Sequence, residues 1–171
     1  LSMDGSIENT RELRDRLEDD GVIFQSLLDS EVIANLIARY HKDDLDQAVI
    51  KAIEDIEGSY SMVLMGNDRL IAARDPHGLK PLVIGRIKDS YVLASETCAF
   101  DTIGAEFIRD IRPGEMVVID DDGIRTVRHK PGERKISLFE YIYLARPDSK
   151  MDGISIYSAR IEAGRQLYRE C

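Results

Sequence analysis

"RLIAARDPHGLKPLVIG", residues 69–85, reads as a strand, a tight turn and a second strand. Its centre, Asp75-Pro76-His77-Gly78, suits a β-turn, because proline fixes φ at the second position and glycine accepts a positive φ. Arg74 and Asp75 are expected to pair and fix the corner. These residues alone predict a structural corner between two antiparallel strands.

The apolar period of two continues on both sides of this corner. Between Tyr60 and His129, short apolar segments alternate with Gly, Asp and Asn turns, which predicts a meander of antiparallel strands. Hairpin turns are expected at 67–68 and 120–123. The segment "SMVLM", residues 61–65, is apolar on both of its sides, so its sheet should be covered on both faces.

Helical periodicity dominates before this meander. Asn9 makes a capping-box pattern with Glu12, and Gly21 is expected to end the first helix. The next stretch, "GVIFQSLLD", reads as extended. Apolar residues three and four positions apart predict further helices over 29–41 and 43–58, and an exit helix starts near 154–155. Helices on one face of an antiparallel sheet, with a second sheet on the other face, give an α+β class.

Composition narrows the classes of function. The 171 residues carry a net charge of −9, which disfavours binding to nucleic acid or to an anionic membrane. The apolar runs are too short to span a bilayer, and the first 20 residues lack the apolar core of a signal peptide. Two distant cysteines, Cys98 and Cys171, make a disulfide framework or a cysteine-ligated zinc site improbable. We therefore expect a cytoplasmic protein.

Several residues are candidates for chemistry, and each has a structural alternative. His77 has no visible nucleophile or second acid beside it, which favours an exposed turn histidine. Cys98 lies in "SETCAF" without a nearby histidine to activate it, which favours a buried thiol. Asp29 either caps a helix or offers its carboxylate to a ligand ammonium group. Gly5, in "MDGS", either exposes a backbone N–H or belongs to a flexible terminus.

Six segments, in this order, resemble the glutamine phosphoribosylpyrophosphate amidotransferase family. They are "GSYSMVLM", "ARDPHGLKPLVIG", "YVLASETCAFD", "IRDIRPGEMVVI", "FEYIYLARPDS" and "GISIYSARIEAG". The resemblance runs from about Met3 to Cys171. It implies an N-terminal-nucleophile hydrolase fold, an αββα layered sandwich. It also implies a parent enzyme that hydrolyses glutamine with an N-terminal cysteine and passes the ammonia to phosphoribosylpyrophosphate, giving phosphoribosylamine in the first step of purine synthesis.

The resemblance also assigns roles to individual residues. The family's oxyanion motif, His-Asn-Gly-Asn, aligns with residues 3–6, so Gly5 keeps a backbone donor, whereas Asp4 places an anion where the family has an asparagine. Asp29 aligns with the aspartate that holds the glutamine amino group. Tyr157 aligns with a tyrosine near the ammonia channel. Ser137 stands where iron–sulfur members have a cluster cysteine, which argues against such a cluster.

On this reading, residues 1–150 form the later part of a glutaminase domain, and 151–171 lead into a phosphoribosyltransferase domain. The chain begins at Leu1, so we expect an incomplete sandwich that lacks the nucleophile and is inactive alone. We expect no cofactor in this chain, with Mg²⁺ needed only by the transferase domain. The expected partners are glutamine and further copies in a homo-oligomer. Two alternatives are a non-catalytic binding or assembly module, and a domain completed by strands from another chain.

Overall fold

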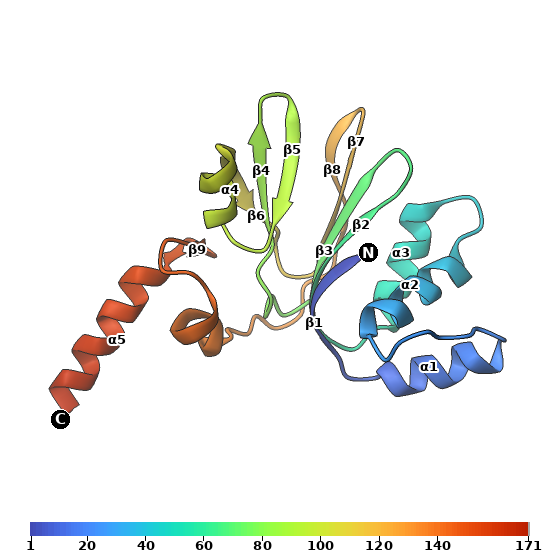
Figure 1. Cartoon of the computed structure of the whole chain (residues 1–171), viewed down its shortest axis with the longest axis horizontal. Coiled ribbons are helices and arrows are strands. Elements are labelled where there is room, and N and C mark those ends of the chain that lie inside the picture. The colour runs from blue at the N-terminus through green and yellow to red at the C-terminus, as the bar shows by residue number, and fades with distance from the viewer. Residues whose placement is uncertain (171) are drawn as a thin grey trace.

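Four layers of helix and sheet form the body of the molecule (Figure 1). The computed structural model describes residues 1–170, so Cys171 and its pairing lie outside the described residues. Helices α1–α3 cover a five-stranded sheet, a three-stranded sheet packs behind it, and α4 lies on the far side (Figure 1). The predicted α+β sandwich with antiparallel sheets is confirmed.

The larger sheet has the strand order β1-β2-β3-β7-β8, and every neighbouring pair is antiparallel. Its strands match the alternating segments of the sequence except for β1, which lies at one edge. The turns at 66–69 and 121–122 join β2 to β3 and β7 to β8, as predicted. The strands are β1 (Ser2–Ile7), β2 (Gly58–Met65), β3 (Leu70–Arg74), β7 (Glu115–Asp120) and β8 (Gly123–His129).

The main apolar core lies between this sheet and three helices. The helices are α1 (Thr10–Asp19), α2 (Asp29–Tyr40) and α3 (Leu45–Asp55). Each buries one face, because residues three and four apart share one helix face, although Leu45 and Ile50 of the stripe expected for α3 are only half-buried. The buried stripes comprise Leu13 and Leu17 of α1, Val32, Ile33, Leu36 and Ile37 of α2, and Ala48, Val49, Ala52 and Ile53 of α3.

A second core joins the two sheets. The smaller sheet has the order β5-β4-β6, with β4 (Val83–Ile87), β5 (Ser90–Ala94) and β6 (Glu106–Asp110). Its outer face is covered by α4 (Cys98–Ile103), and the Phe100 ring packs so closely on Gly85 that a Cβ there would lie 2.9 Å from it. The residues between the sheets are Ala72, Leu82, Ile84, Ile111 and Val117.

The last segment leaves this body. A short π-helix, η1 (Glu140–Leu144), precedes the small ribbon β9 (Lys150–Met151) and β10 (Ile154–Ser155). Helix α5 (Ile156–Glu170) then projects away from the sandwich (Figure 1). Ile156 is its one buried residue and belongs to a small separate cluster with Tyr141, Ala145 and Met151.

Two local expectations were wrong, and one alternative that the sequence left open is resolved by the structure. Asn9 makes no side-chain cap on α1: its amide donates to the Asp55 carbonyl and accepts from the Glu57 N–H, joining α1 to the end of α3. The stretch predicted as extended is an irregular loop over residues 22–28. The "MDGS" segment is ordered as part of β1 and is no flexible terminus. These residues serve tertiary contacts that a local pattern does not reveal.

The predicted pairing of Arg74 with Asp75 was also wrong. The turn itself forms, with the Gly78 N–H donating to the Asp75 carbonyl at 3.1 Å and Gly78 at φ +71°. The Asp75 carboxylate is fully buried and accepts backbone N–H groups of the turn, from His77 at 2.9 Å and Lys80 at 3.2 Å. Arg74 instead pairs with Asp152, across 78 residues of chain.

Candidate functional site

Gly5 occupies a position on β1 that requires glycine. Its φ is +127°, and a Cβ would lie 2.1 Å from the Ser59 carbonyl oxygen of the neighbouring strand. Other residues rarely adopt this φ, so a side chain would be strained as well as in collision. The consequence is a bare stretch of backbone at the edge of the larger sheet, exposed to solvent.

A cavity of about 310 Å³ opens beside this backbone. Asp29 and Gly5, which the sequence placed in one site, both line it. The remaining lining residues are Met3, Leu27, Leu28 and Ser30. The structure thus brings together two predicted site residues that are 24 positions apart.

The Asp29 carboxylate bonds to the end of β1 and the start of α1 and does not cap its own helix. It is the first residue of α2, whose N-cap is Leu28. Its carboxylate accepts the Ile7 N–H at 2.9 Å and the Thr10 hydroxyl at 2.7 Å. Because an ionised carboxylate has about four acceptor sites, two oxygens that each accept one hydrogen bond can still receive a ligand ammonium group.

A second cavity, of about 340 Å³, lies on the other side of β1. Asp4 lines it, and Met3 lines both cavities, so β1 forms the wall between them. The other lining residues come from β1, β2, β5 and the segments next to them: Ser2, Ser61, Val63, Leu82, Leu93, Ala94 and Ser95.

Lys80 pairs with Asp4 and is a site residue that the sequence did not indicate. Its ammonium lies 3.4 Å from the Asp4 carboxylate and donates to the buried Glu140 carboxylate at 3.0 Å. Burial opposes the charged form of Lys80, but the hydrogen bond to Glu140 and the charge of Asp4 outweigh it, so its pKa is raised. The anion beside Gly5 is therefore paired.

The other sequence candidates lie elsewhere. The His77 imidazole is half-exposed, with Nδ1 2.7 Å from the Glu133 carbonyl oxygen. Cys98 is buried at the start of α4, as expected. Tyr157 is exposed on α5 and lines neither cavity at β1, and the Ser137 carbonyl accepts the Glu140 N–H. Within residues 1–170, no three His, Cys, Asp or Glu side chains are grouped to hold a metal such as Mg²⁺.

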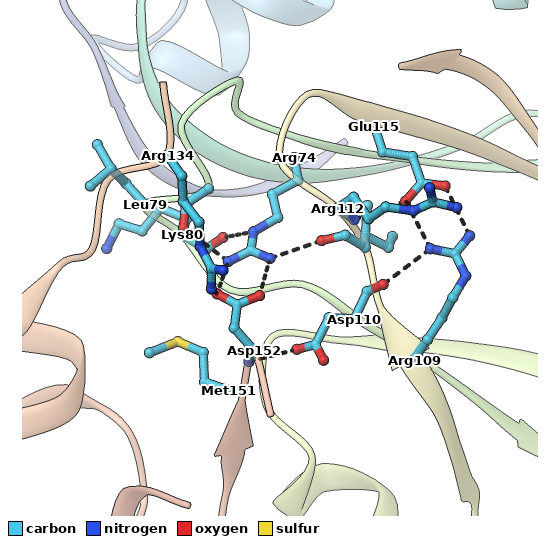
Figure 2. A network of polar contacts seen from close by, with 12 residues as sticks. Arg74, Leu79, Lys80, Arg109, Asp110, Arg112, Glu115, Arg134, Met151 and Asp152 are labelled. Atoms are coloured by element: carbon cyan, nitrogen blue, oxygen red, sulfur yellow. Dashed lines mark hydrogen bonds and ion pairs between the residues drawn. The ribbon is translucent and has the colours of Figure 1, made fainter. Parts of the chain in front are cut away.

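The corner at 69–85 belongs to a buried network, here called the polar seam: Arg74, Arg109, Asp110, Glu115 and Asp152 (Figure 2). The Arg74 side chain is 1% exposed and donates to both Asp152 oxygens, at 2.9 and 3.0 Å. It also donates to three backbone carbonyls, those of Gly78, Lys80 and Ile111. All its donor groups are engaged, so the seam ties the corner to the turn between β9 and β10, which precedes α5.

Two residues of "SETCAF", Glu96 and Thr97, bind the segment that connects η1 to β9. The Glu96 carboxylate accepts the Arg146 N–H at 2.7 Å and the Ser149 hydroxyl at 2.8 Å. The Thr97 hydroxyl accepts the Lys150 N–H at 2.9 Å. The motif thus anchors residues 146–150 to the smaller sheet, and its polar groups are used in structure.

The family model of the glutamine amidotransferase domain matches residues 1–102, more than half of the chain. The chain belongs to this family. Over almost its whole length it is similar to amidophosphoribosyltransferases. It is 44% identical over 173 residues to the one from Archaeoglobus fulgidus, covering 99% of this chain and 38% of that protein. It is 42% identical over 171 residues to the one from Bacillus subtilis, covering 99% and 36%.

Solved structures agree with the sequence matches. The B. subtilis glutamine phosphoribosylpyrophosphate amidotransferase in complex with ADP and GMP superposes with a TM-score of 0.95 at 42% identity, covering 99% of this chain and 38% of that one. A glutamine aminotransferase class-II domain protein from Silicibacter pomeroyi, at 18% identity and a TM-score of 0.55, shares the fold. These findings confirm the predicted family and the N-terminal-nucleophile hydrolase-like sandwich.

The matched relatives are much longer than this chain. The chain spans 38% of the first relative and 36% of the second. Its described helices include none that is both long enough and apolar enough to cross a membrane.

Proposed function

We propose that this chain supplies glutamine-binding surface to an amidophosphoribosyltransferase. That enzyme hydrolyses glutamine and transfers the ammonia to phosphoribosylpyrophosphate, giving phosphoribosylamine. The observation that carries the proposal is the shared cavity of Gly5 and Asp29, in a chain 44% identical to an amidophosphoribosyltransferase. In this reading, Asp29 receives the α-ammonium group of glutamine.

Gly5 supplies the complementary donor. Its N–H would stabilise negative charge on the carboxamide oxygen during attack, as backbone donors do in acyl transfer. Asp4 would oppose that charge if it were unpaired. Its pairing with Lys80 reduces this repulsion.

Binding of glutamine to the ¹⁵N-labelled 171-residue chain tests the proposal. In an NMR titration we expect shifts confined to residues around the cavity, and Asp29→Asn should weaken binding at least tenfold, because it removes the charge that faces the ammonium. Asp15→Asn, an exposed aspartate on α1, is the matched control and should leave affinity unchanged. Unchanged binding in Asp29→Asn would contradict the proposal.

A non-catalytic binding module is the second candidate. It is favoured by the position of the thiol: within residues 1–170 the cysteine is Cys98, which is buried at the start of α4 and lines neither cavity at β1. We therefore expect the 171-residue chain alone to release no ammonia from glutamine. Turnover above background, or a covalent adduct of a glutamine analogue on Cys98, would contradict this expectation.

We also propose that the chain associates into a homo-oligomer. Exposed apolar side chains gather on η1 and α5, which supports the idea. They include Phe139, Ile142, Tyr143, Leu144 and Tyr168. Sedimentation should show species larger than one chain at high concentration, and a strict monomer would argue against association.

A further inference from the structure

The loop before α2 presents three large apolar side chains to solvent. Ile23 and Leu27 are each 89% exposed, and Leu28 is 64% exposed. Leu27 and Leu28 line the cavity that contains Asp29, whereas Ile23 does not. Exposure of this size on adjacent residues is unfavourable in water unless a ligand or partner covers it.

Hydrogen bonds hold this loop in place. The Glu31 carboxylate accepts the N–H groups of Gln25 and Ser26, both at 2.7 Å, and the Ser26 hydroxyl at 2.6 Å. Arg14 donates to the Ser26 carbonyl at 2.5 Å and stacks 4.1 Å from the centre of the Phe24 ring. The backbone that leads into Leu27 and Leu28 is therefore fixed at the rim of the cavity.

We propose that Leu27 and Leu28 are specificity-determining residues that form an apolar wall of the Asp29 cavity. The ligand class is an α-amino acid with an unbranched aliphatic stem: the carboxylate takes the ammonium group and the leucines cover the methylenes. The assignment rests on the proposed role of Asp29. The cavity lining contains one acidic group and no basic side chain, which complements a cationic group at that end of the ligand.

Three ligands that share the α-ammonium and α-carboxylate groups distinguish the contribution of the apolar wall to binding from that of the Asp29 charge. They are L-glutamine, L-norleucine and glycine, titrated into the ¹⁵N-labelled 171-residue chain. Each buried methylene contributes roughly fourfold to a binding constant. We therefore expect norleucine to bind about tenfold more tightly than glycine, and this preference to fall to about twofold or less in Leu27→Ser/Leu28→Ser.

Ile23→Ser provides the matched control, because Ile23 is as exposed as Leu27 in the same loop but lies outside the cavity. It should leave the norleucine preference unchanged. An unchanged preference in the double leucine variant, or an equal loss in Ile23→Ser, would overturn the proposal. Both leucines are exposed, so the variants are expected to fold.

The outcomes also separate this inference from the proposed function. Norleucine binding that depends on the leucines, without glutamine binding, would support the wall and overturn the glutamine function. Glutamine binding that depends on Asp29 but does not change in the leucine variant would support the glutamine function and overturn the wall. Absence of binding by all three ligands would overturn both.

Discussion

The polar seam and the Asp29 cavity show opposite uses of polar and apolar side chains. In the seam, the Arg74 guanidinium and the Glu115 carboxylate are buried, and each has several partners. At the cavity, Leu27 and Leu28 face solvent, and Asp29 keeps acceptor capacity. Charges buried with full sets of partners contribute to structure, whereas apolar groups fixed in water indicate a surface that binds.

This comparison corrects a natural reading of the sequence. The turn at 75–78 collects the residue types that chemistry uses, yet its groups are occupied by the backbone and by the connection to α5. The cavity wall includes residues that attract little notice in the sequence, such as Leu27 and Leu28. Predicted effects on stability should therefore be largest in the seam and smaller around β1.

The largest loss is expected for Arg74→Met. It leaves Asp152 and three backbone carbonyls without their donor, and removing one partner of a buried ion pair costs about 3–5 kcal/mol. Urea unfolding should show this loss in the free energy of unfolding. Arg134→Met is the matched control, since Arg134 lies 3.5 Å from the same carboxylate but is 58% exposed, and its loss should stay below about 1 kcal/mol. Equal losses of stability in the two variants would contradict the distinction between the buried and the exposed partner of Asp152.

Gly5→Ala should cost less, about 1–3 kcal/mol, as is typical for a strained backbone position. The added Cβ collides with the Ser59 carbonyl, so β1 must move, and glutamine binding at the cavity should weaken as well. Gly104→Ala is the control: it has a positive φ of +68° but no atom within 4 Å of a Cβ. If the two variants lose equal stability and glutamine binding is retained, β1 has no special role.

The sequence predicted the periodic parts of this molecule well and the tertiary contacts poorly. Three helices, the exit helix and the strands of both sheets except β1 follow from apolar spacing, because burial of one face imposes that spacing. Asn9 shows the limit of local patterns. An asparagine before a helix is typical of a helix cap, but the Asn9 amide instead joins α1 to the end of α3. At the site, the family resemblance supplied Gly5 and Asp29, whereas Lys80 and the two leucines depend on contacts that only the fold creates.

Lys80→Met tests the contact between β1 and η1, because Lys80 joins Asp4 of β1 to Glu140 of η1. The buried Glu140 carboxylate would lose its ammonium partner, and we expect a loss of about 1–3 kcal/mol. Adding Glu140→Gln should recover part of that loss, because no buried charge then remains unpaired; the Asp4 carboxylate also loses Lys80, but it is 53% exposed. Chemical denaturation of the single and double variants measures this, and a double variant less stable than Lys80→Met would contradict it.

The last comparison concerns pH, and two carboxylates of the polar seam should respond in opposite directions. Burial raises the pKa of Asp110, and the nearby charge of Asp152 adds to the rise. Burial also opposes the charge on Glu115, but hydrogen bonds from Arg109, Thr126 and the Arg112 N–H outweigh it and lower its pKa. A raised pKa stabilises the fold below the unfolded value and loses this contribution as pH rises, whereas a lowered pKa stabilises above the unfolded value and loses it as pH falls.

Asp110→Asn should therefore increase the free energy of unfolding at pH 7 by up to about 1 kcal/mol, and the gain should shrink as pH approaches 4. The amide oxygen can still accept the Asp152 N–H, so the hydrogen bond is kept. Glu115→Gln should instead lose about 1–3 kcal/mol at pH 7, and its deficit should narrow on acidification. Urea unfolding at several pH values between 4 and 7 compares the two. Parallel pH dependences would show that partners, rather than burial, govern both carboxylates of the seam.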